Sequence, residues 1–320
     1  MEKAKVYFTD FRTRAFGDGL PAKLKKLIRA AGVGQIDMDG KFVAIKLHFG
    51  ELGNISYLRP NYARAVADVV KELGGKPFLT DCNTMYPGSR KNALEHLECA
   101  WENGFTPLTV GCPILIGDGL KGTDDIAVPV VGGEYVKEAK IGRAIMDADV
   151  FISLTHFKGH EMTGFGGAIK NIGMGCGRCL GACNFDAISF DDDNANEVLN
   201  CRMAEYAKAV VDGRPSFHIS LVVDVSPNCD CHCENDAPIL PNIGMFASFD
   251  PLALDQACVD ACLAAQPMPN SQLADNLAKP GFQDLHDHFT NSSPESEWRS
   301  CLAHAEKIGL GSRQYELVRL

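Results

Sequence analysis

The feature that most constrains the fold is an alternation of short apolar runs with amphipathic segments through the first half of the chain. The apolar runs fall at residues 6–10, 43–48, 77–81, 108–116 and 150–156. The segments with helical periodicity fall between them, at residues 20–31, 62–73, 90–103 and 141–147. Strands that alternate with helices form mostly parallel sheets. We therefore predict an α/β fold whose mostly parallel sheet carries helices on both faces.

This alternation is interrupted between residues 157 and 198 and resumes afterwards. The interruption holds a glycine-rich loop, closely spaced cysteines and an acidic run. Beyond it we expect a helix at 199–211, a strand at 217–225, a helix at 251–265, an irregular segment at 266–290 and a last helix at 295–308. Asp250 and Pro251 suit the start of the middle helix. The predicted organisation is a first α/β half at 1–172, a small ferredoxin-like cysteine-rich insert at 173–198 and a second α/β half at 199–320.

Charge and hydropathy limit the partners of the chain. Its 41 acidic residues outnumber its 31 lysines and arginines, which gives a formal charge of −10. Nucleic acid is therefore excluded as the main partner, because phosphate contacts need a basic surface. The chain starts without an apolar leader, and no apolar run is long enough to span a bilayer, so we expect a cytoplasmic protein without a membrane partner. The oligomeric state is left open.

Thirteen cysteines in a protein of a reducing compartment favour metal binding or redox chemistry over disulfides. Cys176, Cys179 and Cys183 reproduce the last three positions of the ferredoxin run C-x2-C-x2-C-x3-C, whose first position is here Gly173. Soft thiolates at this spacing predict an iron–sulfur cluster, [4Fe–4S] by type, with zinc as the rival metal. A fourth ligand would come from Cys201 or from a second cysteine group, or one iron would stay open.

The second cysteine group is Cys229, Cys231 and Cys233. Alternate residues of an extended chain point the same way, so these thiols would converge on a second metal, zinc or iron. This spacing is much less specific than the ferredoxin run. A turn with three unligated thiols is the alternative interpretation.

A glycine-rich loop over residues 155–175 carries the third group of candidate residues. Its glycines permit positive φ and a close approach of the backbone to a ligand. His156, Lys158, His160 and Lys170 add cationic donors and proton carriers, and we predict them as the catalytic residues. An anionic ligand, such as a carboxylate or phosphate, would suit this loop. The alternative is a tight structural loop whose histidines are satisfied by carbonyl groups.

Ligands of parallel sheets bind beyond the C-terminal ends of the strands. His48 and Asp81 stand at two such ends, and Gly166, Gly167 and Asn171 belong to the glycine-rich loop. We predict that these five residues bind the ligand or cofactor in a cleft of the α/β domain.

Seven stretches carry longer motifs: residues 44–51 (AIKLHFGE), 79–86 (LTDCNTMY), 156–160 (HFKGH), 166–175 (GGAIKNIGMG), 229–231 (CDC), 247–251 (ASFDP) and 309–317 (GLGSRQYEL). Together they resemble the DUF362 family of iron–sulfur-centre proteins, whose function is largely uncharacterised. The resemblance implies the α/β fold and a ferredoxin-like insert, often with two four-cysteine runs, directly after the Gly-Met-Gly-Cys end of the loop.

The junction at Gly175 departs from that family pattern, because the loop runs almost directly into Gly177-Arg178-Cys179. Our hypothesis is that a segment that supplied the missing cysteine is absent from this sequence. An intact mass that matches 34.6 kDa would contradict it.

A weaker similarity concerns the lactate racemase superfamily, in which histidines and a lysine around glycine-rich loops act on a 2-hydroxy acid with a nickel pincer cofactor. The first functional interpretation is an iron–sulfur protein, an oxidoreductase if it is an enzyme, that couples electron transfer to a small anionic substrate or a redox partner protein. The alternatives are a non-redox isomerase or lyase of the lactate-racemase type and a metal-binding module without turnover.

Overall fold

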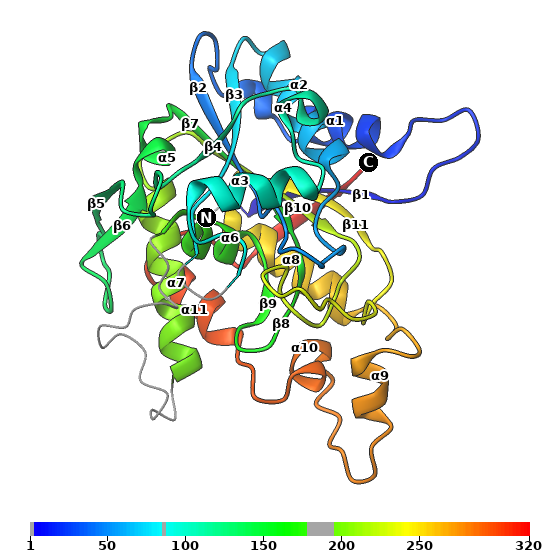
Figure 1. The fold of residues 1–320 in the computed structure, drawn as a ribbon. Helices are drawn as coiled ribbons and strands as arrows, with labels where there is room; N and C mark the ends of the chain where they lie inside the picture. Colours follow the sequence, from blue (N-terminus) through cyan, green and yellow to red (C-terminus); the bar gives the residue numbers. More distant parts are fainter. Residues whose placement is uncertain (1–2, 85–87, 178–194) are drawn as a thin grey trace.

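The computed structural model describes residues 3–84, 88–177 and 195–320, and these residues form an eight-stranded sheet at the centre of the molecule (Figure 1). The strand order is β12-β1-β11-β10-β7-β2-β3-β4. The strands are β1 (Ala4–Asp10), β2 (Phe42–Lys46), β3 (Lys76–Asp81), β4 (Ile114–Ile116), β7 (Val150–His156), β10 (Ser216–Val222), β11 (Gly244–Ser248) and β12 (Tyr315–Arg319). Only β11 runs antiparallel to its neighbours in this sheet, so the predicted mostly parallel α/β fold is confirmed.

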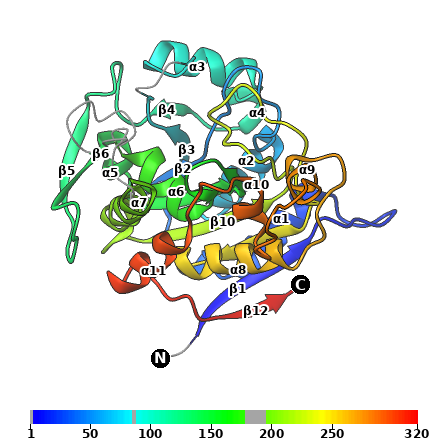
Figure 2. The ribbon, with the colours of Figure 1, turned by 90° about the horizontal axis from the view of Figure 1, so that it is seen from below.

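Helices cover both faces of the sheet, because successive strand residues point to opposite sides. Val43 and Ile45 of β2 belong to one apolar cluster, together with α1 (Leu20–Ala30) and α2 (Pro60–Glu72). The opposite cluster takes Ala44 and is covered by α6 (Ala168–Cys176), α7 (Ala195–Val211), α8 (Pro251–Leu263) and α11 (Arg299–Lys307). Figure 2 shows the edge strand β12 and its neighbour β1 beside α8.

The remaining elements lie around this layered core. The helical ones are η1 (Val33–Gln35), α3 (Ala93–Glu102), α4 (Pro107–Val110), α5 (Arg143–Asp147), α9 (Gln272–Leu277) and α10 (His288–Ser292). Two antiparallel hairpins are formed by β5 (Asp125–Pro129) with β6 (Glu138–Gly142) and by β8 (Lys158–His160) with β9 (Gly164–Gly166).

Three expectations differ from the structure, and the first is the irregular segment expected at 266–290, which holds α9 and the start of α10. The expected strand at 108–116 is wrong in its first half, since α4 starts at Pro107 behind the capping box of Thr106 and Thr109. The expected helix at 141–147 begins two residues late, at Arg143, because β6 pairs with β5 up to Gly142. The helix after Asp250 is confirmed, with the Asp250 side chain accepting from two backbone N–H groups of its first turn.

The parallel strands β2, β3, β7 and β10 end at one common edge of the sheet. From β7 the chain enters the β8–β9 hairpin at once and then returns as α6, which contacts β7, β2 and β10. The chain beyond β10 adds the loop 223–243. The β8–β9 hairpin, α6 and the loop 223–243 thus meet at the edge of the sheet where the ligand-binding residues were predicted.

Candidate functional site

Three charged side chains meet at the end of β7, and we call them the Asp230 centre: His156, Lys158 and Asp230. The Nδ1 atom of His156 lies 2.9 Å from both carboxylate oxygens of Asp230. The Nζ atom of Lys158 lies 3.2 Å from Oδ2 of the same carboxylate. All three side chains are buried. The structure therefore brings two predicted catalytic residues together on a carboxylate that the sequence analysis did not single out.

The Asp230 centre holds more positive than negative charge. Nε2 of His156 lies 2.7 Å from the carbonyl oxygen of Val223 while Nδ1 faces the carboxylate, so both ring nitrogens face acceptors and both carry protons. Burial acts to raise the pKa of Asp230, but the charges of His156 and Lys158 hold it well below the ordinary value. Two cations thus share one carboxylate.

A pair of cysteines lies next to this centre, and we call Cys229 and Cys231 the thiolate pair. Lys170 of α6 donates a hydrogen bond of 3.3 Å from Nζ to the buried Sγ of Cys229. The hydrogen bond from Cys231 is the main cause that lowers the pKa of Cys229 well below its ordinary range, and Lys170 adds to it against burial. The same hydrogen bond raises the pKa of Cys231. Of the two thiols, Cys229 is accordingly the more acidic.

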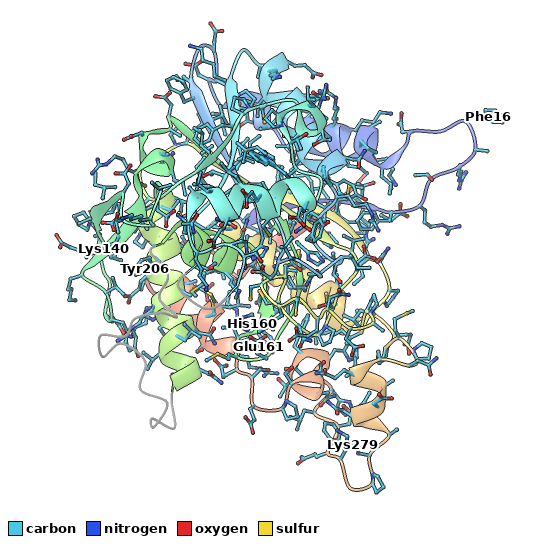
Figure 3. The ribbon with its side chains drawn as sticks, viewed as in Figure 1. Phe16, Lys140, His160, Glu161, Tyr206 and Lys279 are labelled. Atoms are coloured by element: carbon cyan, nitrogen blue, oxygen red, sulfur yellow. The ribbon has the colours of Figure 1, made fainter. Side chains whose placement is uncertain are left out.

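His160, which Figure 3 labels beside Glu161, completes the surroundings of Cys229. Its Nδ1 accepts hydrogen bonds of 3.1 Å from the backbone N–H groups of Met162 and Thr163. The ring proton therefore sits on Nε2, from which His160 donates to Cys229. Burial, together with the charge of Lys170, lowers the pKa of His160, so the ring is neutral at neutral pH.

His48, at the end of β2, is electrostatically coupled to both groups. Burial and the charge of Arg90 lower its pKa well below the ordinary value, and the charges of Asp230, Cys229 and Lys158 also reach it. The charges of Asp230, Lys158 and Cys229 therefore all act on one neutral, half-buried imidazole.

The hydrogen bonds of His48 are mismatched. Its Nδ1 accepts from the backbone N–H of Gly50 at 2.9 Å, and its Nε2 lies 2.9 Å from Nη1 of Arg90. A neutral imidazole has a single lone pair, so it serves one of these two donors at a time. Arg90 is buried, and its Nε atom lies 3.2 Å from Oε2 of Glu51. Arg90 and Glu51 were missed as site residues, although Glu51 closes the quoted motif of residues 44–51.

Asp81 and Asn171 belong to an internal network around Lys46. The Nζ atom of Lys46 lies 3.0 Å from Oδ1 of Asp81 and donates to Oδ1 of Asn171 at 2.8 Å. Asn171 in turn donates to the hydroxyl of Thr155 at 3.1 Å. The second oxygen of Asp81 is buried, lies 3.8 Å from Nε2 of His96 and has no hydrogen-bond partner among the residues that the structure describes. The predicted ligand-binding roles of both residues stay predictions.

Gly166 and Gly167 stand close to the protein's own side chains. A Cβ atom at Gly166 would lie 3.2 Å from Cε of Lys158, and one at Gly167 would lie 2.4 Å from Oδ1 of Asp255. Among the six glycines of the loop, Gly164 alone has a positive φ, of 69°. The close approach that the glycines permit is thus to Lys158 and Asp255. Ligand binding by Gly166 and Gly167 stays a prediction.

Asp255 occupies the N-terminus of α6. Its two oxygens accept from the backbone N–H groups of Ala168 and Ile169 at 2.6 and 2.9 Å. We call this arrangement the Asp255 cap. Burial raises the pKa of Asp255 to about 7. The helix end that would suit an anion therefore carries a carboxylate of the chain itself.

The second cysteine group forms a turn, not the extended segment on which the predicted convergence rested. The backbone N–H of His232 donates to the carbonyl of Cys229 at 3.1 Å. Cys229 is buried, Cys231 half-buried and Cys233 exposed, with its Sγ donating to Glu234 at 2.8 Å. In the part of the chain that the structure describes, no three His, Cys, Asp or Glu side chains are grouped to hold a metal. A second metal at this segment stays a prediction.

Of the predicted cluster ligands, the structure describes Cys176. This residue ends α6 in the apolar core, and burial raises the pKa of its thiol to about 12. Cys179 and Cys183 lie outside the described residues, as does most of the predicted insert. Residues 173–176 of that insert belong to α6. The iron–sulfur cluster stays a prediction.

No helix within the described ranges combines the length and the apolar character needed to cross a membrane. A curated relative, the "Thylakoid-associated protein sll1697" of Synechocystis, is 30% identical over 176 residues, which make up 52% of this chain and 49% of the relative. The chain therefore spans about half the length of that relative.

Two solved structures are similar at low identity. A crystal structure of a Thermotoga maritima protein matches with 15% identity and a TM-score of 0.44, over 76% of this chain and 57% of the other. The lactate racemase apoprotein of Thermoanaerobacterium thermosaccharolyticum matches with 13% identity and a TM-score of 0.41, over 69% and 51%. Residues 43–260 match the family described as a domain of unknown function, DUF362. This match covers more than half of the chain, and the protein belongs to the DUF362 family.

Proposed function

We propose that this protein is an iron–sulfur redox protein that binds a small anionic ligand at the Asp230 centre. The observation that carries the proposal is the pair of buried cations, His156 and Lys158, on the single carboxylate of Asp230. A buried charge without a partner is strongly unfavourable, so a surplus cation favours an anion beside it. A carboxylate or phosphate group would supply that anion.

Arg90 and His48 support the same ligand. The donor group of Arg90 faces a histidine that also accepts from Gly50, and the neutral ring serves one donor at a time. An anionic oxygen beside this pair would be a further acceptor for the guanidinium group of Arg90. His48, Lys170 and Cys231 are the partly exposed members of the site, so a ligand would enter beside them.

The chain provides acid and base groups for such a ligand. His48 and His160 are neutral at neutral pH, since burial lowers the pKa of each ring, and a neutral imidazole can accept a proton. Lys158 would donate a hydrogen bond or a proton to an oxygen of the ligand. The Asp230 carboxylate would hold Lys158 in place.

The position of α6 supports a link between this site and the cysteine run. Lys170 lies in the first turn of α6, and the helix ends at Cys176. Six residues of helix rise by about 9 Å, which separates Lys170 from Cys176, the first cysteine of the predicted run. A bound iron–sulfur cluster would supply single electrons at this end of α6. A redox partner protein would reach it from outside.

A non-redox isomerase or lyase is the second candidate. The observation that favours it is the neutral base His48 within electrostatic reach of the acid Lys158, because this pair can move a proton without an electron source. The reaction would then run on a small hydroxy acid, and a cluster would be structural.

Iron and acid-labile sulfide per chain, measured on anaerobically purified protein with EPR before and after dithionite, test the redox proposal. We expect about four irons and four sulfides and a signal that develops on reduction. The double variant Cys179→Ser/Cys183→Ser should lose them, whereas Cys112→Ser, which changes a buried core thiol, should not. Protein without iron, or with zinc in its place, would sink the redox proposal. Iron that does not respond to dithionite would favour the isomerase or lyase.

A further inference from the structure

We propose that the outer edge of β12 (Tyr315–Arg319) is a self-association surface, on which a second copy of this chain pairs its own β12 in antiparallel orientation. The eight strands of each copy would then form one continuous sheet with those of the other, around a twofold axis. This surface goes beyond the anion site and the cluster, and it depends on neither of them.

β12 is an edge strand with a free side. It ends the strand order of the sheet next to β1, and it lies at the margin of the molecule in Figure 2. No strand in the part of the chain that the structure describes pairs with its outer side. Exposed edges attract further strands unless proline, a bulge or charged side chains oppose the pairing. The five residues of β12, YELVR, include no proline, and their register with β1 is unbroken by a bulge.

The backbone of β12 presents the groups that such a pairing needs. The N–H of Leu320 donates to the carbonyl of Phe8 at 2.9 Å, so every second residue before Leu320 bonds to β1 and the others face outward. The residues with outward N–H and C=O groups are Tyr315, Leu317 and Arg319. A second β12 centred on the first would place Leu317 opposite Leu317 and Tyr315 opposite Arg319. These facing residues are then hydrogen-bonded pairs, so every outward group gains a partner.

The charges along β12 select the antiparallel orientation. Asp260 on α8 is exposed and accepts a hydrogen bond of 2.8 Å from the hydroxyl of Tyr315, so one end of the strand is acidic. The other end carries the exposed guanidinium group of Arg319. Antiparallel pairing brings Arg319 of each copy beside Tyr315 and Asp260 of the other, whereas parallel pairing would bring the like-charged ends together.

The apolar side chains of this edge are only half-buried in one copy. Leu317 packs against the apolar cluster that α8 covers, and Val318 lies on the opposite face of the sheet. In the proposed pairing Leu317 meets Leu317 of the second copy, so the apolar layer beneath α8 continues across the twofold axis. A second copy fits this edge better than an unrelated strand, because β12 itself supplies an acidic and a basic end in the matching order.

Sedimentation velocity across the micromolar range, with a reducing agent that excludes intermolecular disulfides, tests the proposal. We expect a concentration-dependent dimer of the wild-type chain. Arg319→Asp and Asp260→Arg should each weaken the dimer at least about tenfold, because each variant places like charges across the interface. The double variant Asp260→Arg/Arg319→Asp should restore the dimer. The control Lys140→Asp, which reverses the charge of an exposed lysine on β6, should leave it unchanged.

Amide hydrogen exchange at single residues reads the register of the pairing. The amides of Tyr315 and Leu317 should be protected in the wild-type dimer and exchange fast in Arg319→Asp, whereas those of Glu316 and Val318 should stay protected by β1 in both proteins. Protected Glu316 and Val318 amides also show that β12 remains folded in the variant. A wild-type chain that stays monomeric, even one whose edge takes a strand of another protein, would overturn the proposal. A dimer that persists in both single variants, or a loss that the charge swap does not repair, would do the same.

Discussion

Two fully buried carboxylates, those of the Asp230 centre and the Asp255 cap, contact the same stretch of chain from β8 to α6 yet have opposite electrostatics. Asp255 accepts from backbone N–H groups, which carry no net charge, and burial raises its pKa to about 7. Asp230 faces His156 and Lys158, whose charges outweigh burial and lower its pKa. The difference shows that burial alone does not distinguish a ligand site from a helix cap. The charged partners of the carboxylate make that distinction.

The two carboxylates should also affect stability in opposite directions with pH. The raised pKa of Asp255 means that the folded state keeps a proton that the unfolded chain loses, so stability falls as the pH rises from about 4 to about 7. The lowered pKa of Asp230 means that the unfolded chain binds more protons at low pH. Its contribution is therefore present above about pH 4 and is lost below it.

The largest expected effect is that of Asp230→Asn. The substitution leaves the imidazolium of His156 and the ammonium of Lys158 buried without a carboxylate, which should cost about 3–5 kcal/mol in the free energy of unfolding. Urea denaturation measures this loss in the free energy of unfolding. The control is Asp124→Asn, which removes an exposed ion pair of 3.0 Å with Arg143 and should cost less than about 1 kcal/mol. Equal losses in both variants would contradict the cationic surroundings described for Asp230.

Gly167→Ala should have the next largest effect, because the new Cβ would lie 2.4 Å from Oδ1 of Asp255 and would displace the cap. We expect a loss of about 1–3 kcal/mol, measured by urea denaturation. Gly34→Ala is the matched control, since its Cβ would meet a side chain only at 3.8 Å. A Gly167→Ala variant as stable as the wild type would show that the Asp255 cap does not require this glycine.

Asp255→Asn should have the smallest effect, about 1 kcal/mol, because the amide keeps one acceptor oxygen for the helix end. Its pH dependence is more informative than its size. The wild type should exceed the variant in stability by more at pH 5 than at pH 7, since the Asp255 contribution fades across that interval. Thermal denaturation at the two pH values measures this stability difference. A difference that grows toward pH 7 would contradict the raised pKa of Asp255.

Much of the fold could be predicted from the sequence, because strand and helix periodicity is local. The strand predicted at 150–156 coincides with β7, and the predicted helix start at Asp250 is the observed one. The lysines of the site, with His156 and His160, were predicted from the glycine-rich loop, and His48 from its place at a strand end. Short pairings such as β8 with β9 carry little periodicity and were not predicted.

The missed residues depend on tertiary contacts. Nothing local to Asp230 marks it as the partner of His156, which stands 74 positions earlier in the chain. Asp255 likewise meets α6 only after the sheet has formed. The turn at Cys229 replaced an expected extended segment, because one backbone hydrogen bond closes it. The roles of Cys179 and Cys183 lie outside the described residues and stay predictions.

The most direct test of the Asp230 centre as a ligand site is isothermal titration calorimetry with acetate, lactate and inorganic phosphate. Wild-type protein and the control Lys307→Met, which changes an exposed lysine paired with Glu134, should bind at least one of these anions at one site per chain. Lys158→Met should bind the same anion at least about tenfold more weakly, a loss of about 1.4 kcal/mol. Equal affinity in all three proteins, or no binding of any of the anions, would contradict the anion site.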